Sequence, residues 1–147
     1  MTRGGERGLA PRGITPFLAA RDLEQTAAFY AELLGFRVAL RHPPERPTLL
    51  VLESEADEGR SVELLFDTSL WSGPPALTGQ LVLDLGELGA TEPSRVLRLL
   101  ERIGERAELL WGPEVYGYGR REASVRDPNG YALVLSERTD EPPTREP

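Results

Sequence analysis

Two stretches of the chain place apolar residues at helical spacing. The first begins after Asp22, which fits a helix N-cap, and Gln25 would complete a capping box there. It ends at Gly35, since glycine commonly terminates helices. The apolar positions between these residues are Leu23, Ala27, Tyr30, Leu33 and Leu34. The pattern predicts an amphipathic helix between Asp22 and Gly35.

A second amphipathic helix is predicted between Thr91 and Gly104. Thr91 fits its N-cap, and Pro93 is tolerated in a first turn, where the missing N–H would be unpaired anyway. Its apolar stripe consists of Val96, Leu97, Leu100 and Ile103. The charged residues between them are expected to face water.

Eight shorter segments, rich in apolar and β-branched residues, predict strands. They are Ile14–Ala20, Phe36–Arg41, Thr48–Glu53, Ser61–Phe66, Thr78–Leu85, Glu108–Trp111, Arg121–Arg126 and Tyr131–Ser136. Pro16 has no N–H to donate, so the first strand is expected at a sheet edge or bend. Strand, helix and three strands follow each other in this order twice along the chain.

The two halves repeat each other in the order and spacing of their elements. The predicted caps lie at 22 and 91 and the terminating glycines at 35 and 104, so both features recur after 69 residues. A half of this kind cannot bury its sheet alone, so two must pair. We therefore predict a single domain over residues 14–139, a flexible arm before it and, from the Pro- and Glu-rich composition, a disordered tail after it. The predicted ranges are 1–13 for the arm, 14–66 and 78–137 for the halves, 67–77 for their connector and 140–147 for the tail.

Composition and charge narrow the class of protein. The apolar fraction of 39% and the charged fraction of 28% over 147 residues are ordinary for a globular domain. A net charge of −7 argues against a nucleic-acid partner, because phosphate contacts need a basic surface. Without cysteine or lysine, thiolate and Schiff-base chemistry are excluded. No apolar run has the length of a membrane helix and no secretory signal follows Met1, so we expect a cytoplasmic protein without a membrane partner. The exclusive use of arginine suggests a bacterial source.

Two segments carry a family resemblance. The first is Thr15–Tyr30, ending in Thr-Ala-Ala-Phe-Tyr, followed by Leu34–Phe36; the second combines Gly119–Glu122 with Asp127–Tyr131. They resemble the glyoxalase/bleomycin-resistance/extradiol-dioxygenase superfamily, also called the vicinal-oxygen-chelate superfamily, and most closely its bleomycin-resistance-like branch. The resemblance implies an α+β fold in which two βαβββ modules form a cup-shaped, eight-stranded mixed sheet with helices packed outside. From the residues alone, the Asp-Pro-Asn-Gly sequence is a tight turn and the Phe-Tyr pair is core packing.

The resemblance also implies where a metal ion would bind. Metal-dependent members place one ligand on the first and last strand of each half, and matching by strand puts Thr15, Glu63, Gln80 and Val134 at these positions. Thr15 is a poor ligand and Val134 is none, so a divalent ion would lack donors. His42 is the only histidine, which excludes a two-His-one-carboxylate iron site within one chain. We therefore expect neither a metal nor another cofactor.

These observations favour a metal-independent protein that binds a small molecule, for example one that sequesters an antibiotic-like or cationic aromatic ligand and so confers antibiotic resistance. Aromatic side chains beside flexible glycines suit a planar or cationic ligand. Glu63 and Gln80 would project into the cup as polar anchors. The candidate ligand-binding residues are Phe17, Glu63, Trp71, Gln80, Trp111, Tyr116 and Tyr118. The simpler interpretation of the two tryptophans is core or interface packing.

The alternative is a glyoxalase-type lyase, isomerase or transferase. Glu63 would act as general base, and Arg120 or Arg121 would have to stabilise the oxyanion. No pair of residues in the sequence requires this arrangement, so we favour a binding protein and leave enzymatic activity open.

The resemblance further implies a homodimer, and Pro16 with the arm before it suits exchange of the first strand between subunits.

Overall fold

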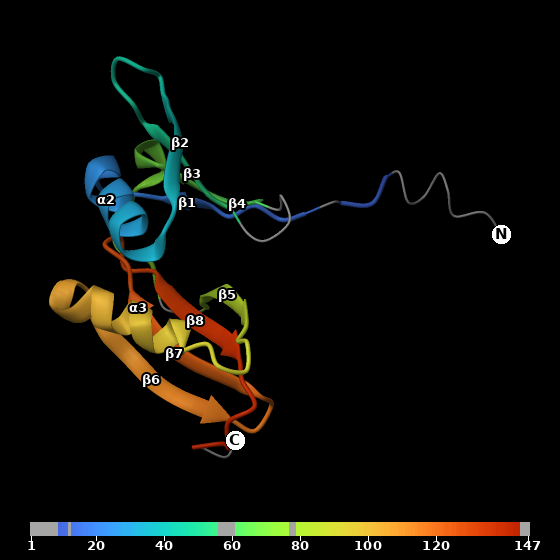
Figure 1. Cartoon of the computed structure of the whole chain (residues 1–147). Helices are drawn as coiled ribbons and strands as arrows, with labels where there is room; N and C mark the ends of the chain where they lie inside the picture. Colours follow the sequence, from blue (N-terminus) through green and yellow to red (C-terminus); the bar gives the residue numbers. More distant parts are fainter. Residues whose placement is uncertain (1–8, 12, 56–60, 77–78, 145–147) are drawn as a thin grey trace.

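Two four-stranded sheets and two α-helices are delimited within the residues that the computed structural model describes (Figure 1). The structure describes residues 9–11, 13–55, 61–76 and 79–144. The α+β class with two βαβββ modules is confirmed. The eight strands, expected in one cup-shaped sheet, divide into two sheets of four that do not close on each other.

The first module contains sheet A and one helix. Its elements are β1 (Phe17–Ala19), α2 (Leu23–Leu34), β2 (Arg37–His42), β3 (Leu49–Glu55) and β4 (Ser61–Asp67). The strand order is β1-β4-β3-β2, and β1 runs parallel to β4. Both predicted ends of α2 are confirmed: Asp22 accepts a hydrogen bond from the Gln25 N–H over 2.8 Å, and Gly35 adopts a φ of 76°.

The second module contains sheet B and repeats the same order. After the short 3-10 helix η2 (Thr68–Leu70), its elements are β5 (Leu81–Glu87), α3 (Arg95–Ile103), the 3-10 helix η3 (Gly104–Arg106), β6 (Leu109–Tyr116), β7 (Arg120–Arg126) and β8 (Ala132–Arg138). The strand order is β5-β8-β7-β6, with β5 parallel to β8. Thus β1 and β5 are the equivalent edge strands of their sheets.

The N-cap of α3 differs from the prediction. Ser94, not Thr91, caps the helix, and its Oγ accepts from the Leu97 N–H over 3.1 Å. The reason is tertiary, because the buried Glu137 carboxylate on β8 accepts from the N–H groups of Arg95 and Val96 over 2.7 and 2.9 Å. These bonds fix where the helix begins, so the 69-residue spacing holds for the glycines and not for the caps.

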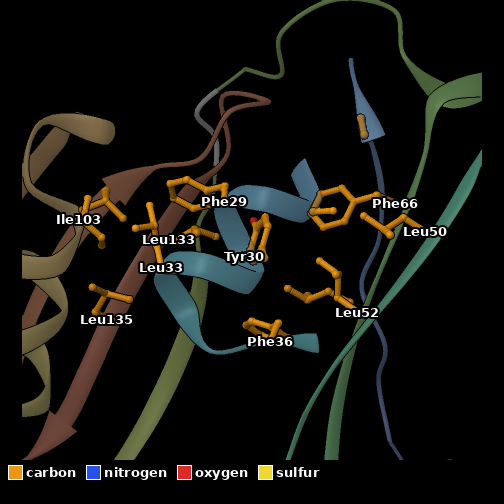
Figure 2. Close-up of a cluster of buried hydrophobic side chains, with 14 of the residues drawn as sticks. Phe29, Tyr30, Leu33, Phe36, Leu50, Leu52, Phe66, Ile103, Leu133 and Leu135 are labelled. Atoms are coloured by element: carbon orange, nitrogen blue, oxygen red, sulfur yellow. The ribbon is translucent and has the colours of Figure 1, made fainter. Parts of the chain in front are cut away.

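The core lies between the two modules, with α2 at its centre. Figure 2 shows Tyr30 and Leu33 of this helix with Leu50, Leu52 and Phe66 of sheet A on one side. Leu133 and Leu135 of sheet B and Ile103 of α3 lie on the other side. The prediction that Phe29 and Tyr30 pack in the core is confirmed. The helices therefore cover one face of each sheet, and the opposite faces stay open.

Polar contacts from the turn before β8 also join the modules. The expected tight turn is confirmed, because the Gly130 N–H donates to the Asp127 carbonyl over 3.1 Å. The Asp127 side chain is buried and accepts from the Tyr30 hydroxyl of α2 over 2.8 Å. Burial raises the pKa of the Asp127 carboxyl, although the hydrogen bond from Tyr30 lowers it.

Two further side chains of this turn hold the first strand. The buried Asn129 accepts from the Arg21 N–H over 2.9 Å. The Tyr131 hydroxyl lies 3.0 Å from both the N–H and the carbonyl of Ala19. The turn before β8 thus ties the end of β1, in the first module, to the second module.

The chain beyond β8 returns to the free edge of β6. Thr144 donates its N–H to the Val115 carbonyl over 2.8 Å, and its hydroxyl accepts from the Val115 N–H over 2.7 Å. Composition predicts disorder for residues 140–147, whereas these hydrogen bonds hold residue 144 against β6. Residues 145–147 of this tail lie outside the described chain. Residues 1–8 and 12 of the predicted N-terminal arm also lie outside it. None of the helices in the described segments is long and apolar enough to cross a membrane.

Candidate functional site

Sheet B exposes one face on the side away from the helices. Along β8, Leu133 and Leu135 point into the core, so Val134 and Ser136 occupy the opposite face. The pairing of the strands places seven more residues of β5, β6 and β7 on this side. We call this surface the open face of sheet B; it comprises Val82, Asp84, Trp111, Tyr116, Arg120, Glu122, Ser124, Val134 and Ser136, with Gln80 just before β5.

Three aromatic side chains meet at one side of the open face. The rings of Trp111 and Tyr116 lie edge to face with centroids 6.2 Å apart, and those of Tyr116 and Tyr118 are stacked with centroids 5.5 Å apart. Gly112, with a φ of 81°, allows the chain to bend tightly after Trp111. A Cβ at residue 112 would lie 2.5 Å from the Glu122 carbonyl oxygen, so only glycine fits there.

Gln80 joins these aromatic residues to the centre of the sheet. Its Oε1 accepts from the Trp111 indole Nε1–H over 3.2 Å and from the hydroxyl of Ser124 over 2.9 Å. Ser124 is fully buried, whereas Gln80 itself is exposed. The Gln80 carboxamide is therefore held in a fixed position at the surface.

A chain of polar side chains crosses the same face. The Tyr118 hydroxyl donates to Glu122, and the Ser136 hydroxyl donates to the other oxygen of this carboxylate over 2.6 Å. Arg120 donates to Ser136 over 2.6 Å and to Asp84 over 2.7 Å. Burial and the Glu122 carboxylate raise the pKa of Tyr118 to about 12, so its phenol stays protonated. The Gly86 N–H and Arg120 lower the pKa of Asp84.

A cleft of about 580 Å³ lies beside this face, between the edges of the two sheets. It is bounded by residues 13–16 before β1, by β4 and by β5. Leu34, Phe36, Leu64, Leu83, Leu85, Leu99 and Leu135 form its apolar walls, while Thr15, Ser54, Ser61, Glu63 and Asp84 supply polar groups. No hydrogen bond or ion pair joins the Glu63 side chain to another residue in the described part of the chain. Asp84 belongs both to the cleft and to the open face of sheet B, so the two regions are continuous.

The predicted site residues fall into three groups. Gln80, Trp111, Tyr116 and Tyr118 come together on the open face of sheet B. Glu63 lies across the cleft in the other module. The remaining two lie apart from these: Phe17 is 51% exposed on the open side of sheet A, and Trp71 follows η2 in the connector. Sequence reasoning missed Asp84, Glu122, Ser124 and Ser136, which alternation along β5, β7 and β8 would have placed on the open face.

The two arginines considered as oxyanion partners lie on opposite faces of sheet B. Arg120 is on the open face, but its guanidinium already binds Ser136 and Asp84. Arg121 lies on the helix side, where it donates to Glu137 over 2.9 Å and forms an ion pair with Glu141. Burial alone would raise the pKa of Glu137, but hydrogen bonds from Ser94, Val96, Arg121 and Arg95 outweigh it and lower the pKa.

The four positions aligned with metal ligands do not fit a divalent ion. Val134 has no donor atom, and the Oε1 of Gln80 is already engaged by Trp111 and Ser124. No three His, Cys, Asp or Glu side chains gather as a metal site would require within the described residues. The donor set therefore disagrees with the metal-dependent pattern at the side-chain level.

Another cavity, of about 690 Å³, lies at the start of α3. The loop before the helix and residues 138–142 form its walls, and it is lined by both acidic and basic side chains. Its position on the helix side of Arg121 separates it from the open face of sheet B.

Comparison with known families gives one result over most of the chain. The model of the Glyoxalase/Bleomycin resistance protein/Dioxygenase superfamily matches residues 14–135. No individually curated protein matches the sequence significantly.

Several solved structures share the fold at low sequence identity. A superfamily member from Sphaerobacter thermophilus is 18% identical, with 88% of this chain and 99% of that chain covered and a TM-score of 0.64. TioX from Micromonospora sp. ML1 is 17% identical, with coverages of 87% and 99% and a TM-score of 0.61. The trypanothione-dependent glyoxalase I of Leishmania major is 18% identical, with 87% of each chain covered and a TM-score of 0.60. At these identities the likeness shows the fold alone.

Proposed function

Because the chain belongs to the Glyoxalase/Bleomycin resistance protein/Dioxygenase superfamily, we propose that it binds a small molecule without a metal ion and sequesters it. The ligand would occupy the cleft between the sheets and extend over the open face of sheet B. An antibiotic-like molecule with a planar ring system and a cationic group fits these surfaces best. This proposal follows the bleomycin-resistance-like branch of the superfamily rather than its enzymes.

The observation that carries the proposal is the Glu63 carboxylate, which is exposed on the wall of a largely apolar cleft and has no hydrogen-bond or ion-pair partner among the described residues. A ligand that fills the cleft would exclude water from this carboxylate, and its attraction for a cationic group of the ligand would then be stronger. The net charge of −7 adds long-range attraction for a cation. Trp111, Tyr116 and Tyr118 supply flat surfaces for a ring on the adjoining face.

We also propose that the protein is a homodimer in which sheet A takes part in the interface. A row of apolar side chains crosses this sheet on the side away from α2, because cross-strand pairing aligns Leu40 with Val51, Val51 with Leu65, and Leu65 with Phe17. Leu40 and Phe17 are 48% and 51% exposed. Contiguous apolar surface of this kind is typical of protein interfaces.

The test is thermal denaturation of EDTA-treated protein with bleomycin as the probe. A ligand at about 100 times its Kd adds roughly 2.7 kcal/mol, which corresponds to about 5–10 °C for a chain of this size. We expect this stabilisation without any metal, and we expect Glu63→Gln to weaken binding at least about tenfold. Glu45→Gln, in the exposed hairpin after β2, is the matched control and should bind as the wild type does.

Two results would count against the proposal. Unchanged bleomycin binding by the Glu63→Gln protein would remove the role of this carboxylate. A large shift with divalent nickel, manganese, zinc or iron alone would contradict metal independence and favour glyoxalase-type chemistry.

A further inference from the structure

We propose that the ligand presents an acceptor oxygen, from an aromatic carboxamide or carboxylate, to the Gln80 side chain. This inference rests on the proposed function and adds the chemical class of the ligand's planar part. It follows from the way two neighbouring side chains, Trp111 and Ser124, orient the Gln80 carboxamide.

The orientation of the carboxamide is fixed by the chemistry of its neighbours. An indole N–H can only donate a hydrogen bond, so the Gln80 atom 3.2 Å from Trp111 Nε1 must be the oxygen. The Ser124 hydroxyl donates to the same oxygen over 2.9 Å. With Oε1 taking two hydrogen bonds, the Nε2 amide group must point the other way.

The Nε2 amide group is available to a ligand. No described residue accepts a hydrogen bond from Nε2, and the Gln80 side chain is exposed. Because Ser124 is fully buried and Trp111 is half-buried, the carboxamide does not need to be reoriented on binding. Such a preorganised donor favours an acceptor atom in the ligand, since little conformational entropy is lost.

The carboxylate nearest to the aromatic residues of the open face is already engaged. Both oxygens of Glu122 accept hydrogen bonds, from Tyr118 and Ser136. Asp84 pairs with Arg120. A cationic or donor-rich group beside the aromatic residues would therefore find the Glu122 carboxylate occupied, whereas an acceptor finds the Gln80 amide. The ligand's cationic group, if present, belongs at Glu63 in the cleft.

The aromatic side chains decide that the acceptor is carried by a ring. Trp111 donates to Gln80 and also contacts Tyr116 edge to face, so a ring lying against this pair places its substituent near the carboxamide. A planar acyl group conjugated with the ring lies in the ring plane and keeps its oxygen within reach of Nε2. These requirements describe an aromatic carboxamide or carboxylate.

The test uses three probes with the same ring system and follows the side-chain amides by NMR. The probes are quinoline-2-carboxamide, quinoline-2-carboxylate and 1-methylquinolinium, of which the last is a cation without an acceptor oxygen. The chain contains two glutamines and one asparagine, so the amide region holds three NH₂ pairs, from Gln25, Gln80 and Asn129. We expect the two acyl probes to move the Gln80 pair downfield and to leave the Gln25 pair unchanged.

Gln80→Glu is the decisive variant, because it keeps the oxygen that binds Trp111 and Ser124 and removes the donors. Its Kd for quinoline-2-carboxamide should rise at least about tenfold, and its Kd for the carboxylate should rise more because two anions would meet. Gln25→Glu, on the exposed side of α2, is the matched control and should leave both constants unchanged.

The other outcomes distinguish failure of the Gln80 inference from failure of the proposed function. Binding of 1-methylquinolinium in preference to both acyl probes, or a Gln80→Glu Kd within twofold of the wild type, would overturn the inference. Bleomycin binding that still depends on Glu63 would then leave the proposed function intact. If none of the three probes bound and bleomycin failed as well, both proposals would be wrong.

Discussion

Replacement of Tyr30 by phenylalanine tests the polar contact that joins the two modules. The Tyr30 ring would remain in the core, and only its hydroxyl would be lost. That hydroxyl donates to Asp127 Oδ2 over 2.8 Å, and both side chains are buried, with exposures of 0% and 4%. Without it, the nearest remaining donor to this oxygen is Asn129 Nδ2 at 3.5 Å.

The expected cost follows from the charge of the acceptor. A buried hydrogen bond to an ionised group contributes about 1.5–3 kcal/mol. Roughly 2–4 °C of Tm correspond to each kcal/mol in a chain of this size, so Tyr30→Phe should melt about 3–12 °C lower at pH 7. Because the lost bond lowered the Asp127 pKa, the variant should have a still higher pKa at this carboxyl.

The pH dependence gives a second check with a definite sign. In the folded protein the Asp127 pKa is raised, so keeping this carboxyl ionised costs stability above that pKa. The hydroxyl of Tyr30 offsets part of this cost, and its effect should shrink as pH falls and Asp127 becomes protonated. The difference between wild type and variant should therefore be largest near neutral pH.

Urea denaturation followed by circular dichroism measures this difference. Tyr116→Phe is the control, because its hydroxyl has no partner among the described residues, and a change below about 0.5 kcal/mol is expected for it. A similarly small change for Tyr30→Phe at pH 7 would refute the role given to the Tyr30–Asp127 bond.

Three further predictions concern other parts of the molecule. Glu137→Gln should cost about 2–3 kcal/mol at pH 7, measured by urea denaturation, because it weakens the buried charge that binds the start of α3. Because the folded-state pKa of Glu137 is lowered, its contribution to the free energy of unfolding is complete above the unfolded-state pKa of about 4.3. This contribution is lost as pH falls through the folded-state pKa. A difference between wild type and Glu137→Gln that stays constant down to pH 2 would contradict this prediction. Gly112→Ala should cost clearly more than Gly73→Ala in the same assay, since both have a positive φ but a Cβ meets backbone atoms only at residue 112. Light scattering of the wild type should give about twice the chain mass of 16.2 kDa. Leu40→Glu should shift the protein toward the monomer, whereas Leu97→Glu on α3 should not. A monomeric wild type would exclude the dimer.

Local signals in the sequence predicted those elements whose ends are set by their own residues. Asp22 and Gly35 end α2 as expected, because the cap and the left-handed glycine act within one helical turn. The start of α3 was misplaced at Thr91, since its position depends on Glu137, which lies far away in the sequence. A prediction from local residues had no access to this contact.

The candidate site was predictable in its aromatic part and not in its polar part. Trp111 and Tyr116 could be proposed from their surroundings in the sequence, and the structure brings them to Gln80. The chain from Asp84 to Tyr118 depends on the register of three strands, and a slip of one residue would move each side chain to the other face. The separation of Glu63 from Gln80 also depends on how the two sheets are placed, which repeat spacing does not define.

Binding of a small molecule without metal, in the cleft and over the open face of sheet B, can be followed residue by residue. The most direct measurement is an NMR titration of EDTA-treated, ¹⁵N-labelled protein with bleomycin. We expect shifts at the Trp111 indole N–H, the Gln80 amide, and residues 61–64 and 81–84, which border the cleft. Shifts confined to residues 87–97 and 138–142, around the cavity at the start of α3, or binding that appears only after a divalent metal is added, would contradict it.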